Sequence, residues 1–226
     1  MTGIRIGKYD IELLILIAGI MISFLLNEWR VSNQQKEEKN RIVNQFIDDL
    51  KADTLQIKEH SSIIERVTLS CQSLMVNDSM IDLAETSTNV TMMLNTVSDK
   101  FNEAAYIEAS STGKIGLIEN HDLRYRLITM YDQSHPEIYG WHEVDMKENF
   151  PALTRYVNAN VPFSPQLNFT TLTAAKQEQL ASAILTDEFK NLVQMNLIIK
   201  SGTGQLYGMK KEECIALIAL LEEELE

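Results

Sequence analysis

Hydrophobic and polar residues follow two different patterns along this chain. The run Leu13–Leu26 (LLILIAGIMISFLL) is apolar on every side and is interrupted only by Gly19 and Ser23. With its flanks it covers residues 11–29, and a helix of about 20 apolar residues crosses a bilayer. The pattern therefore predicts one transmembrane helix near the N-terminus.

The ends of this segment support a retained membrane anchor over residues 1–29. Tyr9 and Trp29 lie at its two ends, where aromatic rings favour the membrane interface. A buried core helix and a cleaved signal peptide are the alternatives. The polar stretch that follows at once argues against the first, and NEWRVSNQQ lacks the small-x-small cleavage site of the second.

Beyond Asn27 the apolar residues take helical spacing. An apolar stripe recurs every seven residues, at Val43, Leu50, Ile57, Ile64 and Cys71. This spacing is typical of a coiled-coil or bundle helix, with Glu38 expected on its solvated face. Polar residues interrupt the stripe at Asp53, Thr54, His60 and Ser61, which favours a bundle helix over a two-stranded zipper. No Pro or Gly lies between Gly19 and Gly113, so the membrane helix is expected to continue to about Val76.

The pattern after residue 76 predicts further helices. We expect a turn within residues 77–90, a second helix over Thr88–Glu103, and another from Asn120 or Asp122 to about Gln133. The four prolines and Gly140 lie within residues 136–165, so residues 134–172 are expected to be an irregular connection.

The last stretch is helical again. Thr173–Leu185 is expected to be one helix, and Thr186 with Asp187 is expected to cap a closing helix that reaches the end of the chain. Gly202, Gly204 and Gly208 together cost that helix about 3 kcal/mol relative to alanine, so a bend or an unusually close neighbour is expected there.

The predicted fold class is mainly α. An N-terminal transmembrane helix continues into a long helix of an antiparallel bundle, and residues 30–226 form one acidic helical domain. More than about 60% helix is expected, well above the average of globular domains, with helices 40–76 and 187–225 antiparallel.

Composition and charge mainly exclude classes of function. The formal net charge of −12 resides outside residues 1–26, and no segment gathers the basic residues that phosphate binding requires, so nucleic acid is excluded as a partner. Cys71 and Cys214 are the only cysteines and form no metal or redox motif. Both occupy apolar positions of helices, so we expect two separate, buried, reduced thiols.

Candidate chemistry is confined to one region. His121, His135 and His142 lie close in sequence, accompanied by acidic residues, and imidazole and carboxylate groups bind zinc or iron. Their spacing follows no HExxH or ExxH pattern, so the simpler interpretation is a solvated polar loop. These three histidines remain the only candidate metal ligands, and neither a catalytic residue nor a cofactor is predicted.

Three segments resemble a family of uncharacterised, mainly Bacteroidota membrane proteins, domain of unknown function 6090. The first is IELLILIAGIMISFLLNEW, with Glu12, Gly19, Asn27 and Trp29 at the family's positions. The second, ASSTGKIGLIENHDLRYRLITMY (109–131), is similar to the family's Ser-Ser-Gly-x-Leu-x-Leu-Ile-x-Asn-x-x-Leu-Arg segment, with Thr112 extra and Ile115 in place of Leu.

The third segment, EFKNLVQMNLIIKSGTGQLYGMKKEECIALIALLEEEL, is similar to the family's closing helix, although its glycines depart from the pattern. Residues 136–185 are unmatched. The resemblance implies an anchor followed by a helical domain, and it implies no activity.

These observations predict a non-enzymatic, membrane-anchored helical protein of the bacterial envelope that binds a protein partner or self-associates. A ligand-sensing helical domain that acts through a partner is the alternative, followed by a metal-dependent enzyme. The expected location is the bacterial inner membrane, as a single-pass protein in the lipid bilayer. Basic residues flank the segment on both sides, so orientation is nearly balanced, with a weak preference for a periplasmic domain.

Overall fold

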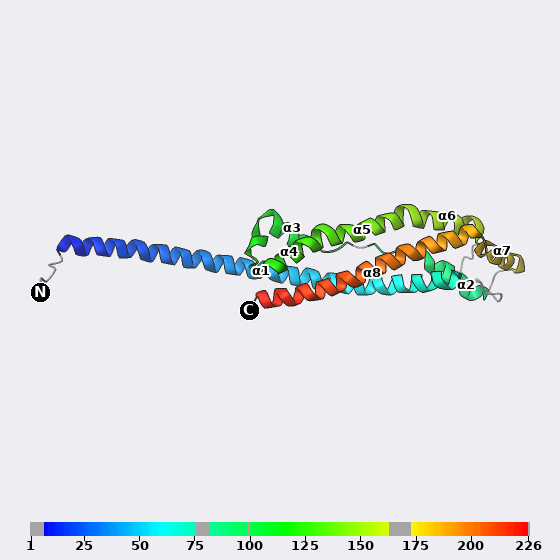
Figure 1. Cartoon of the computed structure of the whole chain (residues 1–226), viewed down its shortest axis with the longest axis horizontal. Coiled ribbons are helices and arrows are strands. Elements are labelled where there is room, and N and C mark those ends of the chain that lie inside the picture. Colours follow the sequence, from blue (N-terminus) through cyan, green and yellow to red (C-terminus); the bar gives the residue numbers. More distant parts are fainter. Residues whose placement is uncertain (1–6, 76–81, 99, 163–172, 226) are drawn as a thin grey trace.

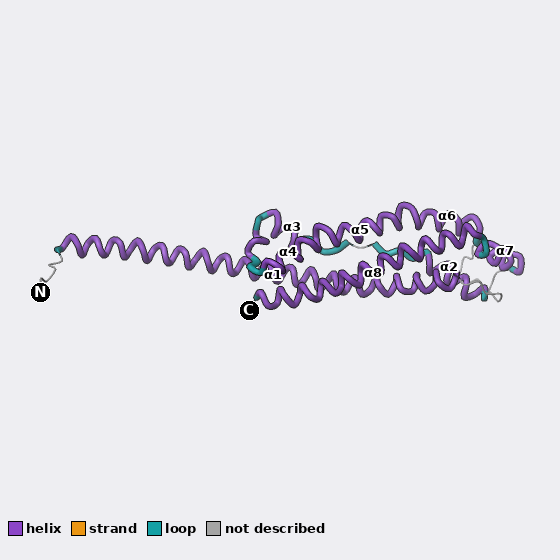
Figure 2. The backbone as a smooth tube through the Cα atoms, in the orientation of Figure 1, coloured by secondary structure: helices purple, strands orange, loops and turns teal. Residues whose placement is uncertain are grey.

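A computed structural model describes residues 7–75, 82–98, 100–162 and 173–225. Helices make up 89% of these residues, and none of the described residues forms a strand. The molecule is an elongated bundle with a single helix projecting from one end (Figures 1 and 2). This confirms the mainly α class.

Helix α1, Lys8–Met75, runs for 68 residues and joins the apolar segment to the bundle. At 1.5 Å per residue it is about 100 Å long. From Glu12 to Glu37 its side chains are exposed, and from Ile42 onward buried residues recur mostly three or four positions apart, as on one face of a helix. Within the described residues this is the one helix long and apolar enough to cross a membrane. No break separates residue 29 from residue 30, so the expected anchor and domain share one helix.

Helix α8, Asp187–Glu224, lies antiparallel against the bundle half of α1. Near its start the Lys190 ammonium donates to the Leu74 carbonyl, and at its end Glu224 pairs with Lys39 at 3.4 Å. The Thr186 hydroxyl accepts a hydrogen bond from the Phe189 amide and caps the helix. The predicted antiparallel pair and its capping residue are therefore confirmed.

A third helical layer covers this pair and corrects the sequence interpretation. Residues 121–160 form α4 (His121–Thr129), the π turn η2 (Met130–Ser134), α5 (His135–Val144), the π turn η3 (Asp145–Asn149) and α6 (Phe150–Asn160), one directly after another. The expected irregular connection is therefore wrong over residues 134–160, and residues 163–172 lie outside the described part.

The two prolines of this layer explain why it stays helical. A proline inside a helix clashes with the carbonyl four residues earlier. Here Pro136 and Pro151 each follow a π turn. The amide just before each proline donates to the carbonyl five residues earlier, where a regular α-helix would use the carbonyl four residues earlier. The wider turn gives the proline ring room, so the helix bulges instead of ending.

The segment between α1 and α4 is less helical than the sequence suggests. Helix α2, Leu83–Met93, is capped by the Asp82 carboxylate, and α3 spans Ala104–Ser111. The predicted helix over Thr88–Glu103 is confirmed only up to Met93, because the described residues between α2 and α3 (94–98 and 100–103) are not helical. A 3₁₀ turn, η1 (Lys114–Leu117), precedes α4, whose amides are capped by Asn120 as expected. Helix α7, Ala174–Ile184, confirms the predicted 173–185 helix.

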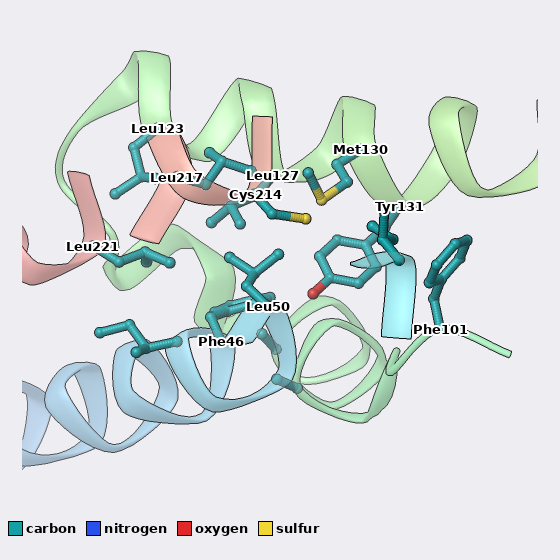
Figure 3. Close-up of a cluster of buried hydrophobic side chains, with 14 of the residues drawn as sticks. Phe46, Leu50, Phe101, Leu123, Leu127, Met130, Tyr131, Cys214, Leu217 and Leu221 are labelled. Atoms are coloured by element: carbon teal, nitrogen blue, oxygen red, sulfur yellow. The ribbon is translucent and has the colours of Figure 1, made fainter. Parts of the chain in front are cut away.

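The apolar stripe of α1 is the centre of the core. All five of its residues are buried, with at most 4% exposure. Figure 3 shows Leu50 and Phe46 of α1 facing Leu217 and Leu221 of α8, under Leu123 and Leu127 of α4. Cys71 and Cys214 are both buried and free, which confirms the prediction of separate thiols.

One smaller expectation, the close neighbour at the glycines of α8, is confirmed, and another is revised. A Cβ atom added to Gly202 would lie 2.8 Å from the Trp141 ring, so glycine permits close packing there and α8 does not break. Glu38, expected on the solvated face, is half-buried and pairs with both Arg41 and Lys114, because α3 and η1 cover that side of α1.

Candidate functional site

The three candidate metal ligands are not brought together. The exposed His121 ring lies 2.6 Å from the Arg124 guanidinium at the start of α4. The His135 Nδ1 atom lies 3.2 Å from a Glu103 oxygen, and His142 Nε2 lies 3.1 Å from the Tyr207 hydroxyl. In the part of the chain that the structure describes, no three His, Cys, Asp or Glu side chains are grouped to hold a metal.

The solvated-loop interpretation is also wrong for two of these histidines. His135 is fully buried and His142 nearly so, because both lie on the inner face of α5, seven residues apart. Polar side chains cross the core of the bundle at two levels, and His135 belongs to the first of them.

The first level, here called the Asp53 layer, consists of Asp53, Asn102, Tyr131, His135 and Lys210. Asp53 belongs to α1 and is fully buried. Its Oδ1 atom accepts hydrogen bonds from the Asn102 amide and side chain, both at 2.9 Å. Burial raises the pKa of Asp53, while these hydrogen bonds and the charge of Lys210 lower it. The layer fixes the non-helical segment before α3 to α1.

Aromatic rings surround the other members of the Asp53 layer. The Lys210 ammonium lies 4.0 Å from the centre of the Phe101 ring, a cation–π contact. The His135 ring is 4.9 Å from the Phe101 ring and 4.8 Å from the Tyr131 ring. Burial, with the nearby Lys210 charge, lowers the pKa of His135 to about 3, so its imidazole is neutral near pH 7. Burial likewise raises the pKa of Tyr131.

The second level, here called the Asp145 layer, consists of Cys71, Asp145, Asn149, Asn196 and Lys200. Lys200 of α8 forms an ion pair with Asp145 of η3, and both side chains are at most 5% exposed. The Asn149 amide donates to Asp145 at 2.8 Å and to Asn196 at 2.9 Å. Asn196 in turn donates to the Met93 carbonyl at 2.9 Å, so the layer joins α8 to η3 and to the end of α2.

Neither layer contains an activated nucleophile. Burial raises the pKa values of Cys71 and Cys214 to about 11, so both thiols are protonated near neutral pH. Among the remaining titratable groups of the two layers, Asp145 pairs with Lys200, and the Tyr131 and His135 rings contact each other. Chemically, the layers are suited to holding helices in register and to binding small polar species, more than to covalent catalysis.

The sequence contained one signal for these layers. Asp53 interrupts the apolar stripe of α1, and a buried interruption requires a polar partner. The lysines and asparagines of α8 gave none, because polar residues share its buried face with apolar residues such as Leu217 and Leu221. Leu192 and Leu206 are only half-buried, whereas Asn196, Lys200 and Lys210 are buried.

A surface groove lies where α1 leaves the bundle. It encloses about 460 Å³ between α1, η1 and the end of α8, with Lys36, Lys39, Glu119 and Glu224 on its walls. Both charge signs line it, so it favours neither an anion nor a cation.

The chain matches no protein-family model, no curated protein and no solved structure. The resemblance to domain of unknown function 6090 therefore stays a prediction.

Proposed function

We propose that this protein is a non-enzymatic, membrane-anchored helical protein of the bacterial inner membrane, which acts by binding a protein partner or a second copy of itself. The observation that carries the proposal is the continuity of α1. Its apolar segment projects beyond the end of the bundle, where its side chains are exposed, and the same helix supplies the central stripe of the core. One continuous helix therefore holds the bundle at the membrane.

The exposed faces of the bundle supply contact surface for such a partner. Leu55 and Leu69 of α1 are 65% and 58% exposed, and they lie on one helical face because they are two heptads apart. Met195 and Met209 of α8, also two heptads apart, are 52% and 67% exposed. Exposed apolar side chains that recur on one face are typical of sites at which another helix docks.

Ligand sensing is the second candidate, and one observation favours it. The two polar layers lie between helices of a bundle, where small ligands commonly bind. A signal from either layer would reach the membrane through α1, since Asp53 and Cys71 both belong to that helix. A metal-dependent enzyme receives no such support, because the three candidate histidines lie apart.

Site-specific photo-crosslinking in cells tests the leading proposal. A photoreactive amino acid at Leu55, Leu69 or Met209 is expected to give a discrete crosslinked species, identified by mass spectrometry as a partner or a second copy. The matched control is the same residue at buried Leu50, which should crosslink only within the chain. A strictly monomeric protein without crosslinks from any exposed position would refute the proposal.

Orientation is tested by thiol labelling. Ser164, a natural choice in the proline-containing region, lies outside the described residues, so exposed Lys58 of α1 is the better site. Lys58→Cys is expected to react with a membrane-impermeant maleimide in intact spheroplasts, while the two native thiols are buried and do not react. Labelling only after the inner membrane is broken would mean a cytoplasmic bundle.

A further inference from the structure

Three buried polar atoms of the Asp53 layer have no hydrogen-bond partner within the described part of the chain: Asp53 Oδ2, the Tyr131 hydroxyl and His135 Nε2. Their side chains are 0%, 5% and 0% exposed. An unsatisfied polar group in a protein interior costs about 1–3 kcal/mol, so three together in one layer call for a common partner.

The three side chains are neighbours where α1, η2 and α5 meet. The Tyr131 and His135 rings meet edge to face, and Figure 3 shows the Tyr131 hydroxyl directed toward α1. Asp53 approaches from α1: its Oδ1 atom binds Asn102, the neighbour of Phe101, and its charge acts on the Tyr131 hydroxyl. The Phe101 ring, which the Lys210 ammonium contacts, lies beside the His135 ring.

The hydrogen-bonding roles of the three atoms can be assigned. His135 Nδ1 faces a Glu103 carboxylate oxygen, which can only accept, so Nδ1 carries the proton and Nε2 is an acceptor. Asp53 Oδ2 is a second acceptor, and the Tyr131 hydroxyl is available as a donor. The missing partner must therefore donate two hydrogen bonds and accept at least one.

We propose that this region is a binding site for one ordered water molecule, which donates to Asp53 Oδ2 and His135 Nε2 and accepts from the Tyr131 hydroxyl. Water has this set of donors and acceptors, and a buried water typically makes about three hydrogen bonds. An anion would be repelled by the two hydrogen-bond acceptors, Asp53 Oδ2 and His135 Nε2. A metal cation would be repelled by the nearby Lys210 ammonium. The water links α1 to the third helical layer, independently of whether the protein binds a partner.

Relaxation dispersion of water ¹⁷O nuclei tests the proposal on the full chain in detergent micelles. The method counts water molecules that are held longer than the tumbling time, and hydroxyl protons do not contribute. The His135→Phe variant is expected to lose one such water. Tyr131→Phe, a milder change, is expected to shorten its residence time about tenfold, as the loss of one buried hydrogen bond implies. Circular dichroism checks that each variant is folded.

Tyr207→Phe is the matched control. The Tyr207 hydroxyl is buried but contacts His142 directly at 3.1 Å, so its removal is expected to leave the water of the Asp53 layer in place. Equal dispersion in the wild type and in both folded site variants would overturn the proposal. So would a ¹⁵N spectrum in which His135 Nε2, rather than Nδ1, carries the proton.

Discussion

Gly202→Ala and Gly208→Ala are the same chemical change, six residues apart in α8, in two different surroundings. A Cβ atom at residue 208 meets nothing within 4 Å, whereas one at residue 202 would lie 2.8 Å from the Trp141 ring. Replacing a helical glycine by alanine stabilises a helix by about 1 kcal/mol. We expect Gly208→Ala to raise the free energy of unfolding by about that amount.

At residue 202 the same gain is opposed by a steric cost. Overfilling a well-packed contact costs about 1–3 kcal/mol, because the ring and its helix must move. Gly202→Ala should therefore change stability by between about 0 and 2 kcal/mol in the destabilising direction. The two variants are expected to differ by about 1–3 kcal/mol.

Denaturant unfolding of the full chain in detergent measures this difference, followed by circular dichroism with the slope m compared among variants. Trp141→Leu in the Gly202→Ala background provides the control, since a smaller side chain removes the clash and should recover part of the loss. Equal stabilisation by both alanines would refute the close approach of α5 to α8.

Three further predictions concern the core. Leu50→Ala should lower the free energy of unfolding by about 2–5 kcal/mol, and Lys58→Ala, on the exposed face, by less than about 0.5, as measured by denaturant unfolding. The folded-state pKa of His135, about 3, lies below its ordinary value of 6.5. The unfolded chain therefore binds an extra proton between these pH values, and stability should fall as pH drops from 6.5 toward 3, by up to about 1.4 kcal/mol per pH unit. His135→Phe should flatten this pH profile. Cys71 and Cys214, with pKa values raised to about 11 by burial, should resist a maleimide in the folded protein and react after denaturation; rapid labelling of the folded chain would contradict their burial.

Helix α1 follows from local pattern, and this explains why it could be predicted. The heptad spacing of the stripe and the lack of glycine and proline are properties of α1 itself, so no distant residue is needed to infer its helix. The capping residues Asn120 and Thr186 likewise act within a few residues of their own position. Their helices begin where the sequence predicted.

The third layer was missed for a tertiary reason. Pro136 and Pro151 normally end a helix, but here the π turns before them are compatible with burial of Ile138 and Leu153 against the rest of the bundle. The partners of Asp53 and Lys200 are also distant in sequence, 49 and 55 residues away. A single sequence contains no pattern that pairs them.

Because α1 is continuous, a tilt of its apolar segment also moves the far end of the bundle. Met75 lies 46 residues beyond Trp29, which corresponds to about 70 Å of helix. Transmembrane helices tilt by about 20° on average, depending on bilayer thickness and on their neighbours. If the apolar segment spans a membrane as proposed and α1 stays straight, a tilt of that size displaces the far end of the bundle sideways by about 24 Å, but changes its height above the membrane by only about 4 Å. Bilayer thickness would then set the lateral reach of the bundle while leaving its height almost constant.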